Sequence, residues 1–247
     1  MEFVENTIGT KQFLQVKSWL AAGLQHGFGC ADLDVKNESS GWAAVSSARL
    51  LLLQQVHGIR VVSVAEAMET EAQIEADGFY GRTSDSREGP VAVGIKTADC
   101  APVILFDPRA GLFAALHCGW RSSVDGIVYA ALDKLAELGA SAKHIEAAIG
   151  PAAGGASYEV GPEVADIFEN AARKTARSQA AQSCISHKDG QIFADNPALL
   201  RLQLESRGVG RDRILLSNSC TISSSKYFSF RRQKDLSGRQ VSFVICA

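Results

Sequence analysis

Two short apolar runs on either side of a turn sequence constrain the fold more than any other stretch of this chain. The runs cover residues 103–106 and 112–116, and the segment 107–111 between them carries Pro108 and Gly111. Proline and glycine at such positions are typical of a hairpin turn. The pattern therefore predicts two antiparallel strands that pair around a symmetric turn.

A symmetric turn sets the register of this hairpin and brings two reactive side chains to one end of it. Phe106 then faces Leu112, and Cys100 falls opposite Cys118 with His117 beside it. Because side chains alternate between the faces of a strand, a regular ladder would point Cys100 and His117 to opposite faces. Their contact therefore requires a bulge or a strand end, which the proline two residues after Cys100 favours.

After the hairpin, the apolar residues change to a helical spacing. They recur every three or four residues over 124–138 and stop before a glycine, which predicts one helix. Ser122 and Ser123 are natural caps at its start. Arg121 then lies at the positive end of a helix next to His117, so the pattern predicts an anion site there.

The remaining pattern predicts strands interleaved with a few helices. Expected strands cover residues 50–53, 59–64, 91–95, 145–149, 214–216 and 241–245, and expected helices cover 13–20, 162–176 and 196–208. Turns are expected at 26–29 and 76–79, and a polar segment at 177–190. These elements indicate an α+β fold with mixed sheets, and we expect residues 1–247 to form a single domain.

Composition excludes several classes of protein. Hydrophobic residues make up 46% of the chain, charged residues 21%, and the formal net charge is -2, which favours no binding to nucleic acid or to anionic membranes. The N-terminus lacks the features of a signal peptide, and no apolar run approaches the roughly 18 residues of a membrane-spanning helix. Six cysteines without CxxC pairs indicate reduced thiols. We therefore expect a cytoplasmic protein.

Three residues form the candidate site, namely His57, Cys100 and His117. Two imidazoles and one thiolate suit Zn²⁺, and three protein ligands leave a fourth position for water or substrate. The same proximity would serve a nucleophilic pair in which Cys100 attacks and His117 acts as the base. The spacings match no short zinc motif, so hydrogen-bonded structural histidines and a core cysteine stay open as interpretations.

Four more residues are candidates at this site. Arg121 and Arg231 offer positive charge to an anion, although an exposed ion pair or a solvated strand edge would explain them equally well. Asp77, which precedes a glycine, and Asp99, which precedes Cys100, are candidates for positioning a ligand or the attacking group. Both aspartates also suit a purely structural role in turns.

Three separated motifs give the chain a resemblance to a known family. They are Gln-Val-His-Gly at 55–58, Thr-Ala-Asp-Cys-Ala-Pro at 97–102 and His-Cys-Gly-Trp-Arg at 117–121. In this order they resemble the YfiH-like family, once described as multicopper polyphenol oxidase with a laccase domain and now as purine nucleoside phosphorylase and adenosine deaminase. Some bacterial members carry the name peptidoglycan editing factor. The likeness runs from about residue 50 to the C-terminus.

The resemblance implies both a fold and a chemistry. The fold would be a four-layer α/β/β/α sandwich, with Zn²⁺ held by His57, Cys100 and His117. The implied reactions are phosphorolysis of adenosine, inosine, guanosine and methylthioadenosine, and hydrolytic deamination of adenosine. Purine nucleosides and phosphate are thus the expected ligands, and the anion site predicted around Arg121 and Ser122 agrees with a need to bind phosphate.

The chain also departs from the family pattern, and other functions stay open. Ser122 stands where the family motif continues with glycine, and cysteines of the family's Gly-Pro loop are absent at 152–157. These differences bear on the substrate range more than on the metal site. The alternatives are a cysteine hydrolase acting on an amide of a cell-wall precursor, a protein that binds a partner around a structural metal, and a polyphenol oxidase. Two histidines and one cysteine cannot furnish a multicopper centre, which disfavours the oxidase.

Overall fold

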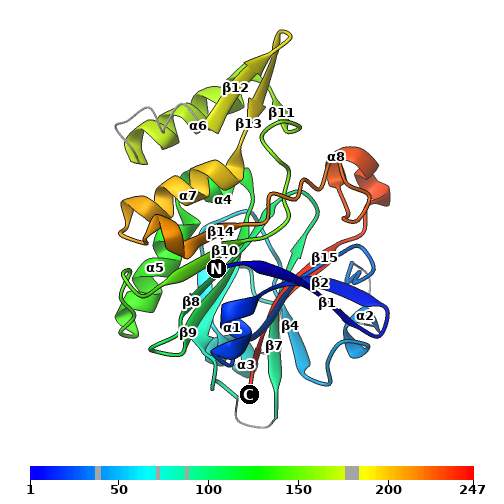
Figure 1. Ribbon diagram of the computed structural model, residues 1–247, viewed down its shortest axis with the longest axis vertical. Coiled ribbons are helices and arrows are strands. Elements are labelled where there is room, and N and C mark those ends of the chain that lie inside the picture. The colour runs from blue at the N-terminus through cyan, green and yellow to red at the C-terminus, as the bar shows by residue number, and fades with distance from the viewer. Residues whose placement is uncertain (37–39, 71–72, 87–88, 176–183) are drawn as a thin grey trace.

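The computed structural model describes residues 1–36, 40–70, 73–86, 89–175 and 184–247, and its frame is a pair of six-stranded sheets (Figure 1). In spatial order the first sheet contains β1 (Phe3–Ile8), β2 (Lys11–Val16), β3 (Gln25–Gly29), β15 (Gln240–Cys246), β7 (Val91–Thr97) and β4 (Arg49–Leu52). The second contains β14 (Ile214–Leu216), β10 (Glu146–Ile149), β8 (Ala101–Asp107), β9 (Leu112–Cys118), β6 (Gly78–Arg82) and β5 (Val61–Ser63). A smaller sheet contains β11 (Glu159–Val160), β13 (Gln191–Ala194) and β12 (Ile185–Lys188).

Both large sheets are mixed, which confirms the predicted α+β class. Most neighbouring strands run antiparallel, and parallel pairs join β4 to β7, β5 to β6 and β10 to β14. The helices are α1 (Lys17–Ala21), α2 (Ser40–Ala43), α3 (Val64–Glu69), α4 (Trp120–Asp125), α5 (Ile127–Glu137), α6 (Pro162–Thr175), α7 (Asn196–Ser206) and α8 (Phe230–Gln233). None of the described helices combines the length and the apolar character needed to cross a membrane.

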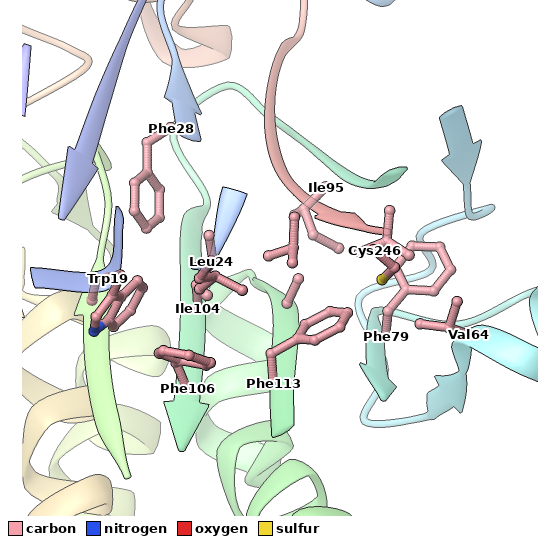
Figure 2. Packing of buried hydrophobic residues seen from close by; sticks show 14 of the residues in the cluster. Trp19, Leu24, Phe28, Val64, Phe79, Ile95, Ile104, Phe106, Phe113 and Cys246 are labelled. Atoms are coloured by element: carbon pink, nitrogen blue, oxygen red, sulfur yellow. The ribbon is translucent and has the colours of Figure 1, made fainter. Parts of the chain in front are cut away.

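The two large sheets pack face to face around the main hydrophobic core. Trp19, Phe28, Phe79, Phe106 and Phe113 are fully buried in it, and Figure 2 shows them between the strands. Burial of each such side chain stabilises the fold by about 1.5–3 kcal/mol. On its other face the second sheet packs against α5 and α7, and a further cluster that includes α2 covers the other face of the first sheet.

The central hairpin forms as predicted, but its register is shifted by one residue. β8 and β9 pair with Phe106 opposite Phe113, whereas the symmetric turn predicted Leu112 at that place. The predicted register is wrong because Asp107 pairs with Leu112, which leaves only four residues in the loop. The Asp107 carboxylate accepts hydrogen bonds from two backbone N–H groups of that loop, and Gly111 closes it at φ 63°.

The observed register removes the need for a bulge at the other end of the hairpin. Ala101 lies opposite Cys118, and Pro102 lies opposite His117. Paired residues point to the same face, and Cys100 lies two residues before Pro102, so Cys100 and His117 share a face. β8 begins at Ala101, which leaves Cys100 at the strand end that the sequence required.

The helix predicted after the hairpin starts earlier than expected and is broken. α4 begins at Trp120, and Gly126 at φ 91° separates it from α5. A left-handed residue ends one helix and re-aims the chain into the next, which glycine does at little cost. Ser122 and Ser123 are buried inside α4, so the prediction that they cap the helix is wrong.

Several N-terminal predictions are also wrong, because the pattern of a short segment does not show its distant pairing partners. Residues 13–20 contain the end of β2 and then α1, residues 26–29 belong to β3, and residues 76–79 run into β6. β3 pairs with β15 and β6 pairs with β9, so partners far along the chain select the extended conformation. In the predicted polar segment 177–190, β12 forms, and the part before residue 184 lies outside the described residues.

A buried histidine links β2 to β3. His26 is fully buried, its Nε2 accepts a hydrogen bond from the Val16 N–H at 2.8 Å, and its Nδ1 donates to the Leu24 carbonyl at 2.9 Å. Burial lowers the pKa of His26 from 6.5 to about 4. Protonation of Nε2 would also break the bond from Val16, so the folded state holds His26 neutral.

We predict that His26 makes the protein less stable in acid. Because its pKa is about 4 when folded and 6.5 in the reference state, its contribution is complete above pH 6.5 and is lost as the pH falls towards 4, by about 1 kcal/mol per pH unit. Urea unfolding at pH 7, 6 and 5 should show a smaller loss of stability for His26→Gln than for the wild type. His187→Gln, at an exposed position of β12, should follow the wild type, and an unchanged slope in His26→Gln would contradict the assignment.

Candidate functional site

The structure brings the three predicted donor residues together at one edge of the second sheet, and we call them the His-Cys-His cluster. His57 lies in the loop between β4 and β5, Cys100 directly precedes β8, and His117 belongs to β9. One ligand atom from each lies within 4.8 Å of the others, and Cys100 Sγ is 3.9 Å from His57 Nε2. His117 is buried and His57 is exposed, so the cluster opens to solvent on one side.

A buried carboxylate supports this cluster from behind. Asp77 lies directly before β6 with no exposed surface, and its Oδ1 accepts a hydrogen bond from His117 Nδ1 at 2.8 Å. The same carboxylate accepts from the backbone N–H groups of Val56, His57 and Gly58 at 3.2, 2.9 and 2.7 Å. Since Nδ1 of His117 donates to Asp77, Nε2 is the nitrogen left to face the cluster.

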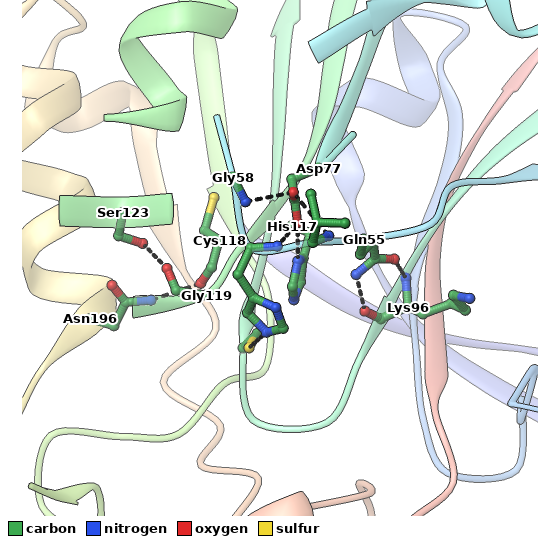
Figure 3. Close-up of polar contacts among 12 residues, drawn as sticks. Gln55, Gly58, Asp77, Lys96, His117, Cys118, Gly119, Ser123 and Asn196 are labelled. Atoms are coloured by element: carbon green, nitrogen blue, oxygen red, sulfur yellow. Dashed lines mark hydrogen bonds and ion pairs between the residues drawn. The ribbon is translucent and has the colours of Figure 1, made fainter. Parts of the chain in front are cut away.

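Two neighbouring residues complete the frame of the cluster, as Figure 3 shows. Gln55 bonds both the N–H and the carbonyl of Lys96 at 2.8 Å, which fastens the His57 loop to β7. Gly119 leaves room for the cluster, because a Cβ placed there would lie 2.7 Å from the His57 ring and 3.4 Å from Cys100 Sγ. A side chain at this position would push the His57 ring away from its place beside Cys100.

The cluster shifts the pKa of its own members. Burial alone raises the pKa of the Cys100 thiol, but the charge and hydrogen bonds of His117, assisted by His57, outweigh it and lower that pKa to about 6. Burial disfavours the charged form of His117, yet Cys100 and Asp77 raise its pKa to about 9. At neutral pH the metal-free cluster thus holds a thiolate beside an imidazolium, whose proton a metal ion would displace.

The donors present fit a zinc ion and fall short of a multicopper centre. One thiolate and two imidazoles are a ligand set that Zn²⁺ takes in catalytic sites, and three ligands leave one position open. Among the described residues, this is the one group of three or more histidine, cysteine or carboxylate side chains that converges closely enough to hold a metal. A centre with several copper ions would need further histidine ligands around this cluster.

Asp99 joins segments of the chain rather than facing the cluster. It lies at φ 91°, and its two carboxylate oxygens accept from the Thr221 hydroxyl and from the Arg231 N–H, both at 2.6 Å. Its backbone carbonyl accepts a hydrogen bond from the Ala153 N–H at 2.9 Å. Asp99 therefore connects the loop of Cys100 to the chain around Ala153 and to the chain around α8.

Two arginines line a cleft of about 540 Å³ beside the cluster. The Arg121 guanidinium lies 4.3 Å from the centre of the Trp120 ring, and that of Arg231 lies 5.0 Å from the centre of the Tyr158 ring. Trp120 and Arg121 follow β9, the strand that carries His117, after a single residue, so the cleft begins next to this end of the cluster. Burial raises the pKa of Tyr158, and the charge of Cys100 raises it further. The remaining lining residues come from β11 and its surroundings, namely Glu159, Val160, Gly161 and Val164.

The structure separates two residues that the sequence placed at one anion site. Arg121 lines the cleft, whereas Ser122 has no exposed surface and lies inside α4. Ser122 therefore does not line the cleft, and its contact with phosphate stays a prediction. The α4 helix starts at Trp120 instead of after the serines, which turns Ser122 inward while Arg121 stays in the cleft.

Two residues near the site went unassigned in the sequence. Tyr158 belongs to a stretch that resembles the family, but only the fold shows that the guanidinium of Arg231 lies over its ring. Cys220 lines a second cavity of about 260 Å³. Burial raises its pKa, but hydrogen bonds from Ser223 and from the Gly154 N–H outweigh this and lower it to about 7. No local sequence pattern marks either residue, because their partners come from distant segments.

Comparison with known proteins finds relatives over most of this chain. A family model described as "Multi-copper polyphenol oxidoreductase laccase" matches residues 27–247. A purine nucleoside phosphorylase of Deinococcus radiodurans is 33% identical over 205 residues, which cover 83% of this chain and 72% of that protein. Adenosine deaminase RL5 of an unknown prokaryotic organism is 31% identical over 202 residues, with 77% and 72% covered. The crystal structure of YfiH from Bacillus licheniformis has the same fold, with a TM-score of 0.79, 23% identity and 98% of both chains covered.

We predict that Cys100 reacts as a thiolate when metal is removed. Its pKa of about 6 means that alkylation by iodoacetamide should rise through pH 6 and stay high above it, because the thiolate is the reactive form. Cys220, with a pKa of about 7, should react one pH unit higher, and the four buried cysteines should stay unmodified. Mass spectrometry of each cysteine after short exposures between pH 5 and 9 measures these profiles.

Added Zn²⁺ provides the control for this prediction. A metal ion on the cluster should suppress alkylation of Cys100 and leave that of Cys220 as it was. Equal modification of Cys100 with and without Zn²⁺ would argue against its role as a ligand.

Proposed function

The chain belongs to the YfiH-like family, and on that premise we propose that it is a purine nucleoside phosphorylase that also deaminates adenosine, with Zn²⁺ in the His-Cys-His cluster. One observation carries this proposal, which is that a three-donor cluster adjoins a cleft lined by Arg121 and Arg231. Phosphorolysis needs a site for an anion next to the nucleoside, and deamination needs an activated water. The cleft and the cluster supply these two requirements side by side.

The arginines of the cleft are suited to hold phosphate. One guanidinium nitrogen of Arg231 donates a hydrogen bond to the Glu159 carbonyl at 2.8 Å, which fixes the orientation of the side chain. Arg121 makes no ion pair with the described residues, and its contact is with the Trp120 ring. A guanidinium without a carboxylate partner binds phosphate oxygens well, because its N–H groups form two parallel charge-assisted hydrogen bonds. The rings of Trp120 and Tyr158 each carry one of these guanidinium groups, which keeps both charges at the cleft.

The cluster would hold the metal through Cys100 Sγ and a nitrogen of each imidazole. When bound, Zn²⁺ supplies Lewis-acid chemistry and lowers the pKa of a water ligand. The protein's own part is to hold His117 in one orientation through Asp77 and to keep the chain at Gly119 clear of the donors. Asp99 keeps the cleft next to the cluster through its bonds to Arg231 and Thr221.

A cysteine hydrolase is the second candidate, and one observation favours it. Asp77, His117 and Cys100 lie in a row, with His117 bonded to the carboxylate on one side and facing the thiol on the other. This is the arrangement of a nucleophile, its base and the group that orients the base. In such a mechanism His57 would be dispensable, whereas it is a ligand in the zinc enzyme.

The two candidates predict different products and a different role for His57. Protein loaded with Zn²⁺ and incubated with adenosine and phosphate should yield adenine with ribose-1-phosphate, and inosine, which chromatography separates. His57→Phe should lose both reactions and bind less than one equivalent of metal, because the set of three ligands is broken. If zinc-loaded wild type turns over no purine nucleoside, the proposal fails. Thiol-dependent amide hydrolysis that survives His57→Phe would support the hydrolase.

Arg121 should matter for phosphorolysis more than for deamination. In Arg121→Leu we expect the KM for phosphate to rise by about 10- to 100-fold, since a hydrogen bond to a charged group contributes about 1.5–3 kcal/mol. At low phosphate, the ratio of adenine to inosine formed from adenosine should fall by a similar factor. Arg211→Leu removes an exposed arginine outside the cleft and should keep the wild-type ratio. An unchanged ratio in Arg121→Leu would remove this residue from the phosphate site.

A further inference from the structure

One carboxylate contacts both histidine-bearing segments of the cluster. Asp77 accepts four hydrogen bonds, one from the His117 ring and three from consecutive backbone N–H groups around His57. Its own backbone carbonyl accepts from the His117 N–H at 2.7 Å. Figure 3 shows the carboxylate between the Gly58 N–H and the His117 ring. The positions of the two imidazoles therefore depend on the same side chain.

These bonds use the acceptor capacity of the carboxylate in full. An ionised aspartate offers about four lone-pair sites, and Asp77 is fully buried with four donors on them. No site is left for a substrate or for a water in transit. Asp77 therefore does not exchange protons with a ligand, and its effect must pass through the groups that it holds.

The loop of His57 needs such support. His57 lies at φ 61°, a left-handed conformation that residues other than glycine adopt rarely. Three successive N–H groups point inward onto Asp77, so the turn is held by its backbone while the His57 side chain stays exposed. Without the carboxylate, three backbone N–H groups would lose their partner, and the turn would lose the bonds that keep it in this conformation.

We propose that Asp77 is the positioning residue of the cluster, setting both the orientation of the His117 ring and the place of the His57 loop so that their nitrogens converge on Cys100. This inference rests on the proposed function in one respect, which is that the converging groups hold a metal ion. The inference goes beyond the proposed function because it makes the metal affinity of the cluster depend on a residue that touches neither metal nor substrate. A carboxylate behind a ligating histidine also increases the basicity of the ring.

The chain contains a matched control for this residue. Asp107 is also a buried aspartate whose carboxylate accepts from three backbone N–H groups, those of Arg109, Ala110 and Ser141. It lies at the opposite end of the β8–β9 hairpin from the cluster. Asp107→Asn therefore imposes a similar change in charge and hydrogen bonding on the fold without touching the cluster.

The test compares Asp77→Asn with Asp107→Asn. Asparagine keeps the shape of aspartate, but its NH₂ group cannot accept a hydrogen bond, so it cannot serve all four donors. We expect the dissociation constant for Zn²⁺, measured by competition with a chromophoric chelator, to rise about 10- to 100-fold in Asp77→Asn and to stay at the wild-type value in Asp107→Asn. The absorption spectrum of the Co²⁺-loaded protein should change in the first variant alone.

Hydrogen exchange tests the inference without any metal. The amides of Val56, His57 and Gly58 should be protected in the metal-free wild type and in Asp107→Asn, and should exchange faster in Asp77→Asn. Wild-type metal affinity together with unchanged protection in a folded Asp77→Asn would overturn the proposal. If that variant does not fold, fast exchange of the three amides in the wild type would overturn it, and slow exchange would support it.

The same measurements separate this inference from the proposed function. A wild type that binds no Zn²⁺ would refute the zinc enzyme, while hydrogen exchange would still decide whether Asp77 holds the His57 loop. A wild type that binds Zn²⁺ but turns over no nucleoside would refute the proposed reaction and leave the role of Asp77 to the affinity measurement.

Discussion

The antiparallel pairing of β8 with β9 in the second sheet is the constraint on which the site depends. Every side chain of both strands is buried, so a slip by one residue would move apolar groups from one core to the other. The two cores therefore hold the register, and the register places His117 opposite Pro102 and on the face of Cys100. Packing in the middle of the sheet thus sets the distance between the Cys100 thiol and the His117 imidazole at its edge.

Local pattern was sufficient wherever an element is defined by its own side chains. The hairpin, the strand at 91–95 and the helices at 162–176 and 196–208 carry clear periodicities or caps, and all of them form within a few residues of the predicted ends. The convergence of His57 with the hairpin did not follow from spacing, because 43 residues and a change of sheet separate it from Cys100. The family resemblance, rather than periodicity, indicated that contact.

What could not be predicted depends on groups that meet only in the folded chain. Asp77 precedes a glycine and resembles a turn former, and four donors from two other segments give it another role. The register of the hairpin depends on one carboxylate, that of Asp107, whose hydrogen bonds stabilise the shorter loop. Ser122 looked like a helix cap because the helix was predicted to start at residue 124, four residues after its observed start at Trp120. In each case, a short polar side chain had several local partners to choose from, and distant backbone decided.

The two sides of the site differ in what holds them, and this difference bears on substrate range. The cluster is attached to the buried ends of β8 and β9 and to a buried carboxylate, so its geometry is tied to the cores. The cleft is built from α4, the two-residue strand β11 and the short helix α8, which are joined through Asp99 and contacts between arginines and aromatic rings. Substitutions there cost less stability than substitutions in a core. A change of ligand is therefore easier to reach through substitutions in the cleft than through substitutions in the cluster.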